Sequence, residues 1–225
     1  MSGAPHCPET PGIHDLEFEY APGRKQRFTL ALPAQTAGAP LVLALHYGGM
    51  VTPWYGRPLL EGLVVPALAL LAPLVCAPES LDGDWTSAAN EQAVLALLDA
   101  LERYRPDSRR RLVTGYSKGA IGTWFFASRH PARFGAAIPI AGTLPSGVDA
   151  CRLPTRVIHS RADSVFPAGD VEAALAALGN AASLTIEFLT GLDHFDVMGF
   201  RPALAASLPW LEEVWNANAQ FVPSD

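Results

Sequence analysis

Two kinds of hydrophobic pattern follow one another along this 225-residue chain. Near the amino terminus, residues 16–20 and 27–32 alternate apolar and polar side chains on either side of the turn Ala21-Pro22-Gly23. That alternation predicts an antiparallel hairpin with one buried face. Residues 40–45 and 71–77 are instead continuously apolar, which is typical of strands covered on both faces. Further strand candidates are residues 112–114, 136–141, 155–159 and 184–189.

Helical spacing of apolar residues separates these strand candidates. Residues 85–104 predict a helix capped by Thr86 or Ser87, and residues 170–178 predict one opened by Asp170. Further helices are expected over residues 118–128 and 201–216 and in the first part of 59–76. The alternation of strand candidates and helix candidates along the chain predicts an α/β fold, with a mainly parallel sheet of about eight strands and helices on both faces. We expect residues 1–225 to form a single domain, with residues 1–14 as a loose tail.

The charge of the chain narrows the classes of partner. Its formal net charge is −6, and only 17% of its residues are charged while 49% are hydrophobic. This composition predicts a large core rather than a disordered chain. The basic residues cluster only in Arg109-Arg110-Arg111, at the start of a strand. We therefore expect neither nucleic acid nor a membrane as a partner, and we leave a homo-oligomer open.

Cysteine use and the amino terminus bear on the cellular compartment. Cys7, Cys76 and Cys151 are widely spaced, without the spacing of metal ligands. We expect buried or incidental thiols in a reducing compartment, with one disulfide left open. Residues 1–19 lack the apolar core of a signal peptide, and prolines and a glutamate interrupt the apolar stretch 59–76. These features predict a soluble, cytoplasmic protein.

The most informative stretch is Gly115-Tyr116-Ser117-Lys118-Gly119, which lies between a strand candidate and a helix candidate. In that context, a Gly-x-Ser-x-Gly sequence places the serine on a tight turn with its hydroxyl exposed above the sheet. The two glycines are needed because a Cβ at either position would collide across the turn. Ser117 is therefore a candidate nucleophile.

A serine hydroxyl becomes nucleophilic at neutral pH only beside a base, which is normally an imidazole oriented by a carboxylate. Reactive side chains gather beyond the carboxyl ends of parallel strands. Ser117, Asp163 and His194 each follow a strand candidate directly. Serine, acid and histidine is also the chain order found on this type of sheet. The sequence thus predicts a catalytic triad of these three residues.

Other histidines and carboxylates suit these roles less well. Asp193 and Asp196 are too close in sequence to His194 to lie behind its ring. The other histidines have positions that favour other roles: His6 and His14 in the tail, His130 in a His-Pro turn, His159 packed in a strand, and His46 ordering a glycine-containing loop.

A tetrahedral intermediate also needs backbone N–H donors for its oxyanion. One candidate is the amide of Lys118, which follows the nucleophile. The second should come from the turn His46-Tyr47-Gly48-Gly49, from either Gly48 or Tyr47. The glycines of this turn could also serve only to make a tight bend.

Together these segments resemble the α/β-hydrolase superfamily, in particular its small feruloyl-esterase, polyhydroxyalkanoate-depolymerase and phospholipase/carboxylesterase-like members. The resemblance runs from about Pro40 to the end of the chain, and residues 159–167 resemble the family's His-Gly-x-x-Asp-x-x-x-Pro stretch. It implies an α/β-hydrolase fold and cleavage of carboxylic esters through an acyl-enzyme intermediate. An acyltransferase or peptidase with the same triad, or a non-catalytic ligand-binding homologue, are the alternatives.

The chain departs from the family pattern at three positions. Tyr47 and Ser160 stand where glycine is usual, and Lys118 stands where methionine, glutamine or histidine is usual. The charge of Lys118 could favour anionic or polar substrates, or it could only face solvent. Residues 143–154 are too few to form a helical cap, so we expect an open site without a large cap domain.

We expect a small-molecule ester as the substrate and neither a metal nor a cofactor, since the chain shows no cluster of metal ligands and no phosphate-binding glycine loop. Loop aromatic residues are candidates for the substrate pocket, although Tyr55 and Trp85 could equally be ordinary packing residues. The candidates are Trp54, Tyr55, Trp85, Phe166 and Phe195.

Overall fold

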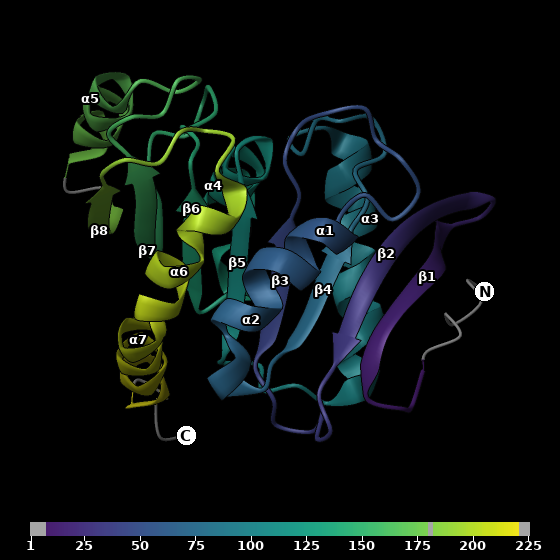
Figure 1. Ribbon diagram of the computed structural model, residues 1–225. Coiled ribbons are helices and arrows are strands. Elements are labelled where there is room, and N and C mark those ends of the chain that lie inside the picture. The colour runs from purple at the N-terminus through teal and green to yellow at the C-terminus, as the bar shows by residue number, and fades with distance from the viewer. Residues whose placement is uncertain (1–7, 180–181, 221–225) are drawn as a thin grey trace.

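Eight strands form one sheet in the computed structural model, which describes residues 8–179 and 182–220. Their order is β1-β2-β4-β3-β5-β6-β7-β8 (Figure 1). β1 and β2 form an antiparallel hairpin, β2 pairs antiparallel with β4, and the other neighbours are parallel. The predicted hairpin and mainly parallel sheet are therefore confirmed. The strands are β1 (Gly12–Ala21), β2 (Arg24–Leu32), β3 (Leu41–Leu45), β4 (Leu74–Pro78), β5 (Arg111–Tyr116), β6 (Ala136–Ile140), β7 (Cys151–Ser160) and β8 (Ala182–Leu189).

Helices cover both faces of the sheet (Figure 1). One face carries α3, α4 and α5, and the other carries α1, α2, α6 and α7, with a π-helical turn at Leu60–Val64 joining α1 to α2. No helix among the described residues has both the length and the apolar character that crossing a membrane requires. The helices are α1 (Arg57–Leu59), α2 (Val65–Ala67), α3 (Ala88–Leu101), α4 (Lys118–Arg129), α5 (Ala168–Leu178), α6 (Arg201–Ala206) and α7 (Leu208–Gln220).

The central strands are apolar throughout because they are buried on both faces. Every residue of β3, β4, β5 and β6 is buried. In β3, Leu43 and Leu45 pack in the core shared with α3 and α4, whereas Val42 and Ala44 pack in the core shared with α2 and α7. The loops that follow these strands are consequently anchored on a rigid scaffold. The connection between β6 and β7 spans only residues 141–150, so a large cap is absent from this position, as expected.

Several boundaries differ from the sequence-based expectation. β1 begins at Gly12, so residues 12–14 belong to the sheet rather than to a tail, while residues 1–7 lie outside the described part. Ser87 caps α3 through its side chain, as one of the two predicted alternatives. Asp170 does not cap α5, because that helix already begins at Ala168; its carboxylate lies in the first turn, where it complements the helix dipole.

The predicted helix over residues 201–216 is divided at Ser207 into α6 and α7. Pro209 has no amide hydrogen and cannot donate to the carbonyl four residues before it, which interrupts the helical hydrogen bonds at this point. The Ser207 hydroxyl adds a bond to the Ala203 carbonyl at 3.1 Å. Hydrophobic spacing alone missed this break because the apolar pattern continues across it.

Candidate active site

Ser117 occupies the sharp turn between β5 and α4. Its backbone angles, φ 55° and ψ −116°, are strained for a residue other than glycine. Its amide donates to the Ile140 carbonyl at 2.9 Å. A Cβ at position 115 would collide with the Gly119 backbone, and one at position 119 would collide with the Leu45 carbonyl. The steric reason predicted for both glycines is thus present in the structure.

The three predicted triad side chains lie in hydrogen-bond contact, although they come from three different loops. The Ser117 hydroxyl donates to Nε2 of His194 at 2.9 Å, and Nδ1–H of His194 donates to Oδ2 of Asp163 at 2.9 Å. All three residues are buried, with relative exposures of 8%, 6% and 6%. Because the carboxylate holds the proton on Nδ1, Nε2 is left to accept the serine proton.

The carboxylates near His194 differ in what they bind. Oδ1 of Asp163 accepts the backbone amides two and three residues further along, at 2.9 and 2.7 Å, which leaves Oδ2 for the imidazole. Asp193 and Asp196 belong to their own loop, where Oδ2 of Asp196 accepts the Asp193 amide at 2.7 Å. The structure therefore brings Asp163, and neither of these neighbours, behind the His194 ring.

Two hydroxyl groups that sequence reasoning missed hold the loop that carries His194. The Tyr116 hydroxyl donates to the His194 carbonyl at 2.7 Å, and the Ser160 hydroxyl donates to the Leu192 carbonyl at 2.6 Å. Ser160 had a signal in the sequence, since it replaces a glycine that the family favours. Tyr116 had none, because it occupies a variable position of the pentapeptide.

The predicted oxyanion-hole residues lie next to one another. Within the described ranges, no hydrogen bond to another backbone group is found for the amide of Tyr47, Gly48 or Lys118. The Lys118 stem crosses directly over Gly48, where an added Cβ would lie 2.9 to 3.2 Å from three of its carbons. The ammonium group continues to the Gly83 carbonyl at 3.5 Å and is exposed. Loops after β3, β4 and β5 thus meet at Lys118.

His46 orders the loop after β3, as expected. Its Nδ1–H donates to the Tyr47 carbonyl at 2.7 Å, and its Nε2 accepts the Ser80 amide at 3.0 Å. Burial lowers the pKa of His46 to about 4, so the ring is neutral near pH 7. Ser80 itself bonds to the buried Asn90 side chain, which also binds Asp82 and thereby organises the loop after β4.

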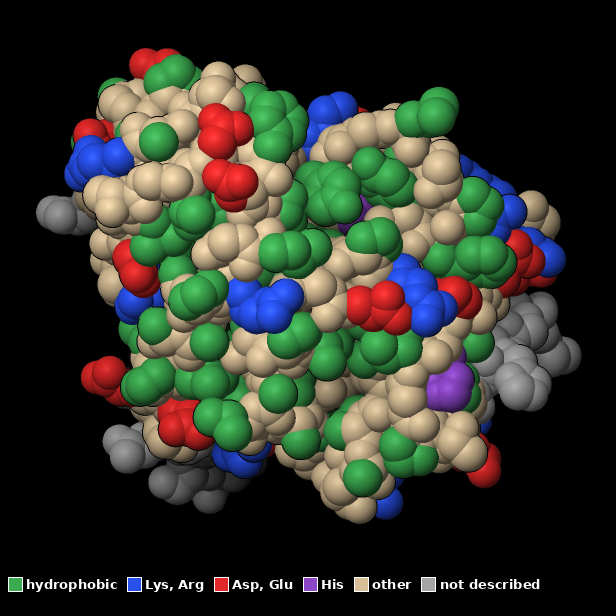
Figure 2. All heavy atoms as spheres, viewed as in Figure 1, with side chains coloured by type: hydrophobic (Ala, Val, Ile, Leu, Met, Phe, Trp, Pro, Cys, Tyr) green, Lys and Arg blue, Asp and Glu red, His purple; other side chains and the backbone are tan. Residues whose placement is uncertain are grey.

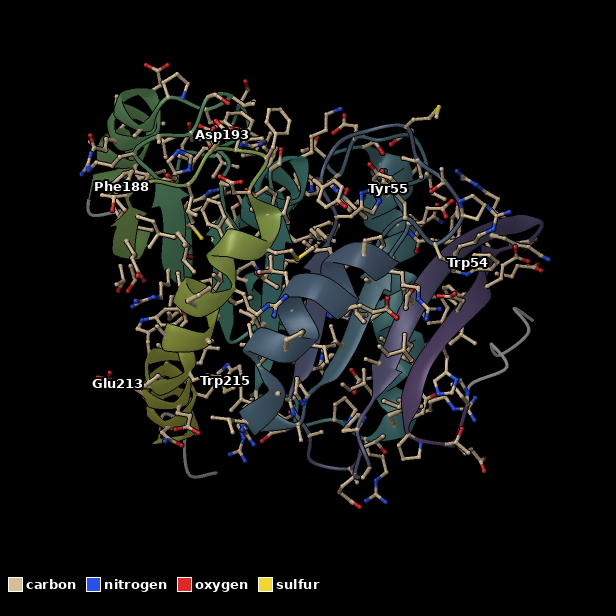
Figure 3. The ribbon with its side chains drawn as sticks, viewed as in Figure 1. Trp54, Tyr55, Phe188, Asp193, Glu213 and Trp215 are labelled. Carbon is tan, nitrogen blue, oxygen red and sulfur yellow. The ribbon has the colours of Figure 1, made fainter. Side chains whose placement is uncertain are left out.

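The candidate pocket aromatics divide into two groups. Phe166 and Phe195 lie against the His194 ring with centroids 5.5 Å away, and Tyr55 lies against His46 and Tyr47. Figure 3 shows Tyr55 and Asp193 on opposite sides of the upper edge of the molecule. These three aromatics therefore border the triad and the loop after β3.

The two tryptophans differ in their surroundings. Trp54 lies over the opening hairpin (Figure 3), with its indole N–H on the Leu16 carbonyl and the Arg27 guanidinium over its ring. Its role as a pocket residue stays a prediction. Trp85 is only 2% exposed, and its indole N–H donates to the His46 carbonyl at 2.9 Å. Trp85 therefore supports the loop after β3, and it also lines a small cavity beside Lys118.

Exposed apolar side chains surround the site. Figure 2 shows hydrophobic groups along the upper edge, over the loops that follow the strands, with acidic side chains among them. The exposed large hydrophobic residues in these loops are Met50, Leu81, Val165, Phe195 and Met198. An open cavity of about 570 Å³ is lined by Leu192, Phe195, Asp196, Val197, Met198 and Gly199. A smaller cavity of about 120 Å³ is lined by Gly83, Asp84, Trp85, Lys118 and Ile121.

The remaining histidines and the cysteines have other surroundings. His130 contacts Glu91 at 2.7 Å, and His159 is buried with Nε2–H on the Phe166 carbonyl at 2.9 Å. Cys76 and Cys151 are buried, unpaired thiols, and Cys7 and His6 lie outside the described residues. Within the described ranges, His, Cys, Asp and Glu side chains form no group of three that could hold a metal ion.

Comparison with solved structures places this arrangement in a known fold. A thermostable esterase superimposes with a TM-score of 0.69 at 22% identity, covering 89% of this chain and 62% of that one. FphF, a fluorophosphonate-binding serine hydrolase of Staphylococcus aureus, gives a TM-score of 0.71 at 14% identity over 90% of this chain and 99% of its own. The chain has the α/β-hydrolase fold.

A third α/β-hydrolase, the S-formylglutathione hydrolase of Agrobacterium tumefaciens, agrees with this assignment. It has a TM-score of 0.69 and 16% identity, and the match covers 94% of this chain and 99% of that one. No model of a protein family matches the sequence, and no curated protein matches it. The chain spans 62% of the length of the thermostable esterase. The predicted fold class is confirmed by these structures, which are esterases and other serine hydrolases.

Proposed function

We propose that this α/β-hydrolase is a serine esterase that cleaves carboxylic esters through an acyl-enzyme intermediate on Ser117. The observation that carries this proposal is the unbroken chain of two hydrogen bonds, each 2.9 Å long, from Ser117 through His194 to Asp163. That geometry provides a nucleophile, a base and an orienting carboxylate in one buried line.

In the first half of the reaction, the Ser117 oxygen forms a bond to the ester carbonyl carbon while its proton passes to Nε2 of His194. The negative charge that develops on the carbonyl oxygen is stabilised by the Lys118 amide and by the amide of Tyr47 or Gly48. When the intermediate collapses, the bond to the alcohol oxygen breaks. His194 returns the proton to that oxygen, so the alcohol leaves neutral and the acyl group stays on Ser117.

In the second half, a water molecule takes the place of the alcohol. His194 removes its proton as its oxygen attacks the acyl carbon, and the same proton is then given to the Ser117 oxygen as the acid departs. The Asp163 carboxylate stabilises the imidazolium that forms twice in each cycle. Two backbone amides already bind its other oxygen, which keeps the carboxylate oriented.

The surroundings favour a small-molecule ester with an apolar portion. Phe166 and Phe195 flank the His194 ring, and Phe195 is also one of the residues that line the open cavity of about 570 Å³. The short β6–β7 connection leaves the nucleophile without a helical cap. A peptide bond in place of the ester would make the same site a peptidase, and an alcohol or amine acceptor in place of water would make it an acyltransferase. The experiment below distinguishes these activities.

The test is covalent labelling combined with steady-state kinetics. We expect a fluorophosphonate to add its phosphonyl mass to Ser117, and nitrophenyl esters of increasing acyl length to be hydrolysed. Ser117→Ala should lose both labelling and at least ~10³-fold in kcat/KM. Ser128→Ala, on the same helix but bonded only to the Phe125 carbonyl, is the matched control and should retain both.

Two results would count against the proposal. Unchanged ester hydrolysis by Ser117→Ala would assign the activity to another group. Faster turnover of a peptide, or faster acyl transfer to an added alcohol than to water, would replace the esterase with a peptidase or acyltransferase that uses the same residues.

A further inference from the structure

The loop that carries His194 follows β8, packs against the apolar core through Leu192, and contacts the Ser164 side chain through Asp193. Its internal bonds are local: the Asp193 amide binds the Asp196 carboxylate, and the Asp196 amide binds the Asp193 carbonyl. Phe195, next to His194, is 76% exposed and adds little buried contact. A loop of this kind opens easily unless specific groups hold it.

Two buried hydroxyls bind the backbone of this loop, and each reaches it from a different strand. Tyr116, at the end of β5, donates to the carbonyl of His194 itself at 2.7 Å. Ser160, at the end of β7, donates to the Leu192 carbonyl at 2.6 Å and accepts the Ala162 amide at 3.2 Å. Both side chains bind backbone atoms of the loop, so they constrain the position of its main chain.

Tyr116 is also rigid and remains a donor. It is 1% exposed, and its ring lies edge-on to Phe200 with centroids 5.3 Å apart and near Tyr47 at 6.4 Å. Burial, together with the Asp163 charge nearby, raises the pKa of Tyr116, so its hydroxyl keeps its proton near neutral pH.

The sequence position of Tyr116 gives this bond a particular consequence. Tyr116 precedes Ser117 directly in the chain, and its hydroxyl binds the backbone of His194. The Tyr116 side chain therefore links the backbone beside the proposed nucleophile, Ser117, to the backbone of the proposed base, His194. Ser160 stands in a similar relation to the acid, because the Asp163 amide binds the Ser160 carbonyl and the Ser160 hydroxyl binds the His194 loop. Each hydroxyl therefore couples the base to one of its two partners.

We propose that Tyr116 and Ser160 are positioning residues that keep His194 within reach of both Ser117 and Asp163. Neither hydroxyl touches the reacting atoms, and the inference rests on the proposed esterase function. Without these bonds, the carbonyls of His194 and Leu192 are released, and the imidazole spends less time in the aligned geometry. Proton transfer in the chemical step should then slow, while binding of the ester should change little.

The experiment compares Tyr116→Phe and Ser160→Ala with two matched variants remote from the site. Tyr104→Phe removes a buried hydroxyl bonded to the Pro8 carbonyl at 2.9 Å, and Ser207→Ala removes one bonded to the Ala203 carbonyl at 3.1 Å. Loss of one hydrogen bond per variant predicts that kcat falls about 3- to 10-fold for Tyr116→Phe, with a similar or smaller fall for Ser160→Ala. KM should stay within about 2-fold, and the remote variants should match wild type in both constants.

A second readout does not depend on turnover. The Nδ1 proton of His194, bonded to Asp163, should give a low-field proton NMR resonance that broadens by exchange in Tyr116→Phe and Ser160→Ala but stays sharp in the remote variants. Equal kcat and an equally sharp resonance in all four variants would overturn the inference. If wild type neither reacts with the fluorophosphonate nor hydrolyses esters, the proposed function fails, and the NMR comparison alone still decides whether these hydroxyls position His194.

Discussion

Two buried histidines lie at this edge of the sheet, His46 after β3 and His194 after β8, and they differ in what their ring nitrogens bind. His46 is 1% exposed and His194 is 6% exposed, so burial does not separate them. Both nitrogens of His46 bond to backbone groups, the Tyr47 carbonyl and the Ser80 amide. Both nitrogens of His194 bond to side chains that can take part in proton transfer, the Asp163 carboxylate and the Ser117 hydroxyl.

The difference teaches that partners, rather than burial, decide the role of a histidine. A ring whose two nitrogens bind backbone groups has no neighbouring acid or base with which to exchange a proton, and it works near pH 7 as a neutral crosslink between the loops after β3 and β4. A ring between a carboxylate and a hydroxyl can accept a proton, since the carboxylate stabilises the resulting cation. The same residue type thus builds the scaffold in one loop and is the proposed base in the other.

The strongest test of this comparison makes the same substitution at both positions. His194→Gln removes the proposed base, so kcat/KM should fall at least ~10³-fold while the melting temperature changes little. His46→Gln removes a buried crosslink, so the free energy of unfolding should fall by about 2 kcal/mol, while kcat/KM stays within about tenfold. Ester hydrolysis and thermal melting of the two variants measure both effects. The reverse pattern would contradict this comparison: His46→Gln would then lose activity, and His194→Gln would lose stability.

The pH dependence of the free energy of unfolding gives a separate measure of what His46 contributes to stability. Its pKa is lowered from 6.5 to about 4 by burial, so the unfolded chain binds a proton there in a pH range where the folded chain does not. Stability from this residue is therefore complete above about pH 6.5 and is lost as the pH falls from there to about 4. At ~1.4 kcal/mol for each pKa unit, the full loss is about 3 kcal/mol.

Urea denaturation of wild type and His46→Gln at pH 7 and at pH 4.5 measures this contribution. Both proteins carry the same other titrating groups, so the difference between their pH slopes belongs to His46. We expect wild type to lose more unfolding free energy over this range than the variant does. Equal slopes would mean that His46 takes up its proton in the folded protein as readily as in the unfolded one.

The sequence was most informative where one residue type satisfies a strict physical demand. Gly115 and Gly119 were predictable because a Cβ at either position collides with backbone. Ser117, Asp163 and His194 could be proposed together because each follows a strand whose carboxyl end must lie at the same edge of the sheet. The mainly parallel character of the sheet also followed, since continuous apolar runs indicate strands that are buried on both faces.

The sequence was least informative where a contact depends on the course of a loop. The Tyr116 and Ser160 hydroxyls donate to carbonyls 78 and 32 residues away, and carbonyls carry no residue-specific signal. Trp54 and Tyr55 are adjacent in the chain, yet one packs on the hairpin and the other beside His46. Trp54 has φ 55°, and this local turn sends the two side chains in different directions.

The smallest effect that we predict concerns the backbone of the His46 loop rather than its histidine. Gly48→Ala places a Cβ 2.9 to 3.2 Å from three carbons of the Lys118 stem, which is flexible enough to move aside. We therefore expect kcat to fall by only about 2- to 5-fold, through a small displacement of the amides proposed to bind the oxyanion. Lys118→Ala removes the obstructing stem, so Gly48→Ala made in that background should cost less than it does in wild type.

Steady-state kinetics of the two single variants and the double variant give this coupling directly. Lys118→Met serves as the control, because it keeps an unbranched stem but removes the charge. If contact with the Lys118 stem causes the effect, Gly48→Ala should lower kcat by the same factor in the Lys118→Met background as in wild type. This factor should also be the same for neutral and anionic esters. If Lys118→Met instead relieves the effect, or changes only the rate with anionic esters, then the charge of Lys118 acts on the substrate. In that case the charge of Lys118, rather than the packing of its stem against Gly48, would explain how this loop affects the reaction.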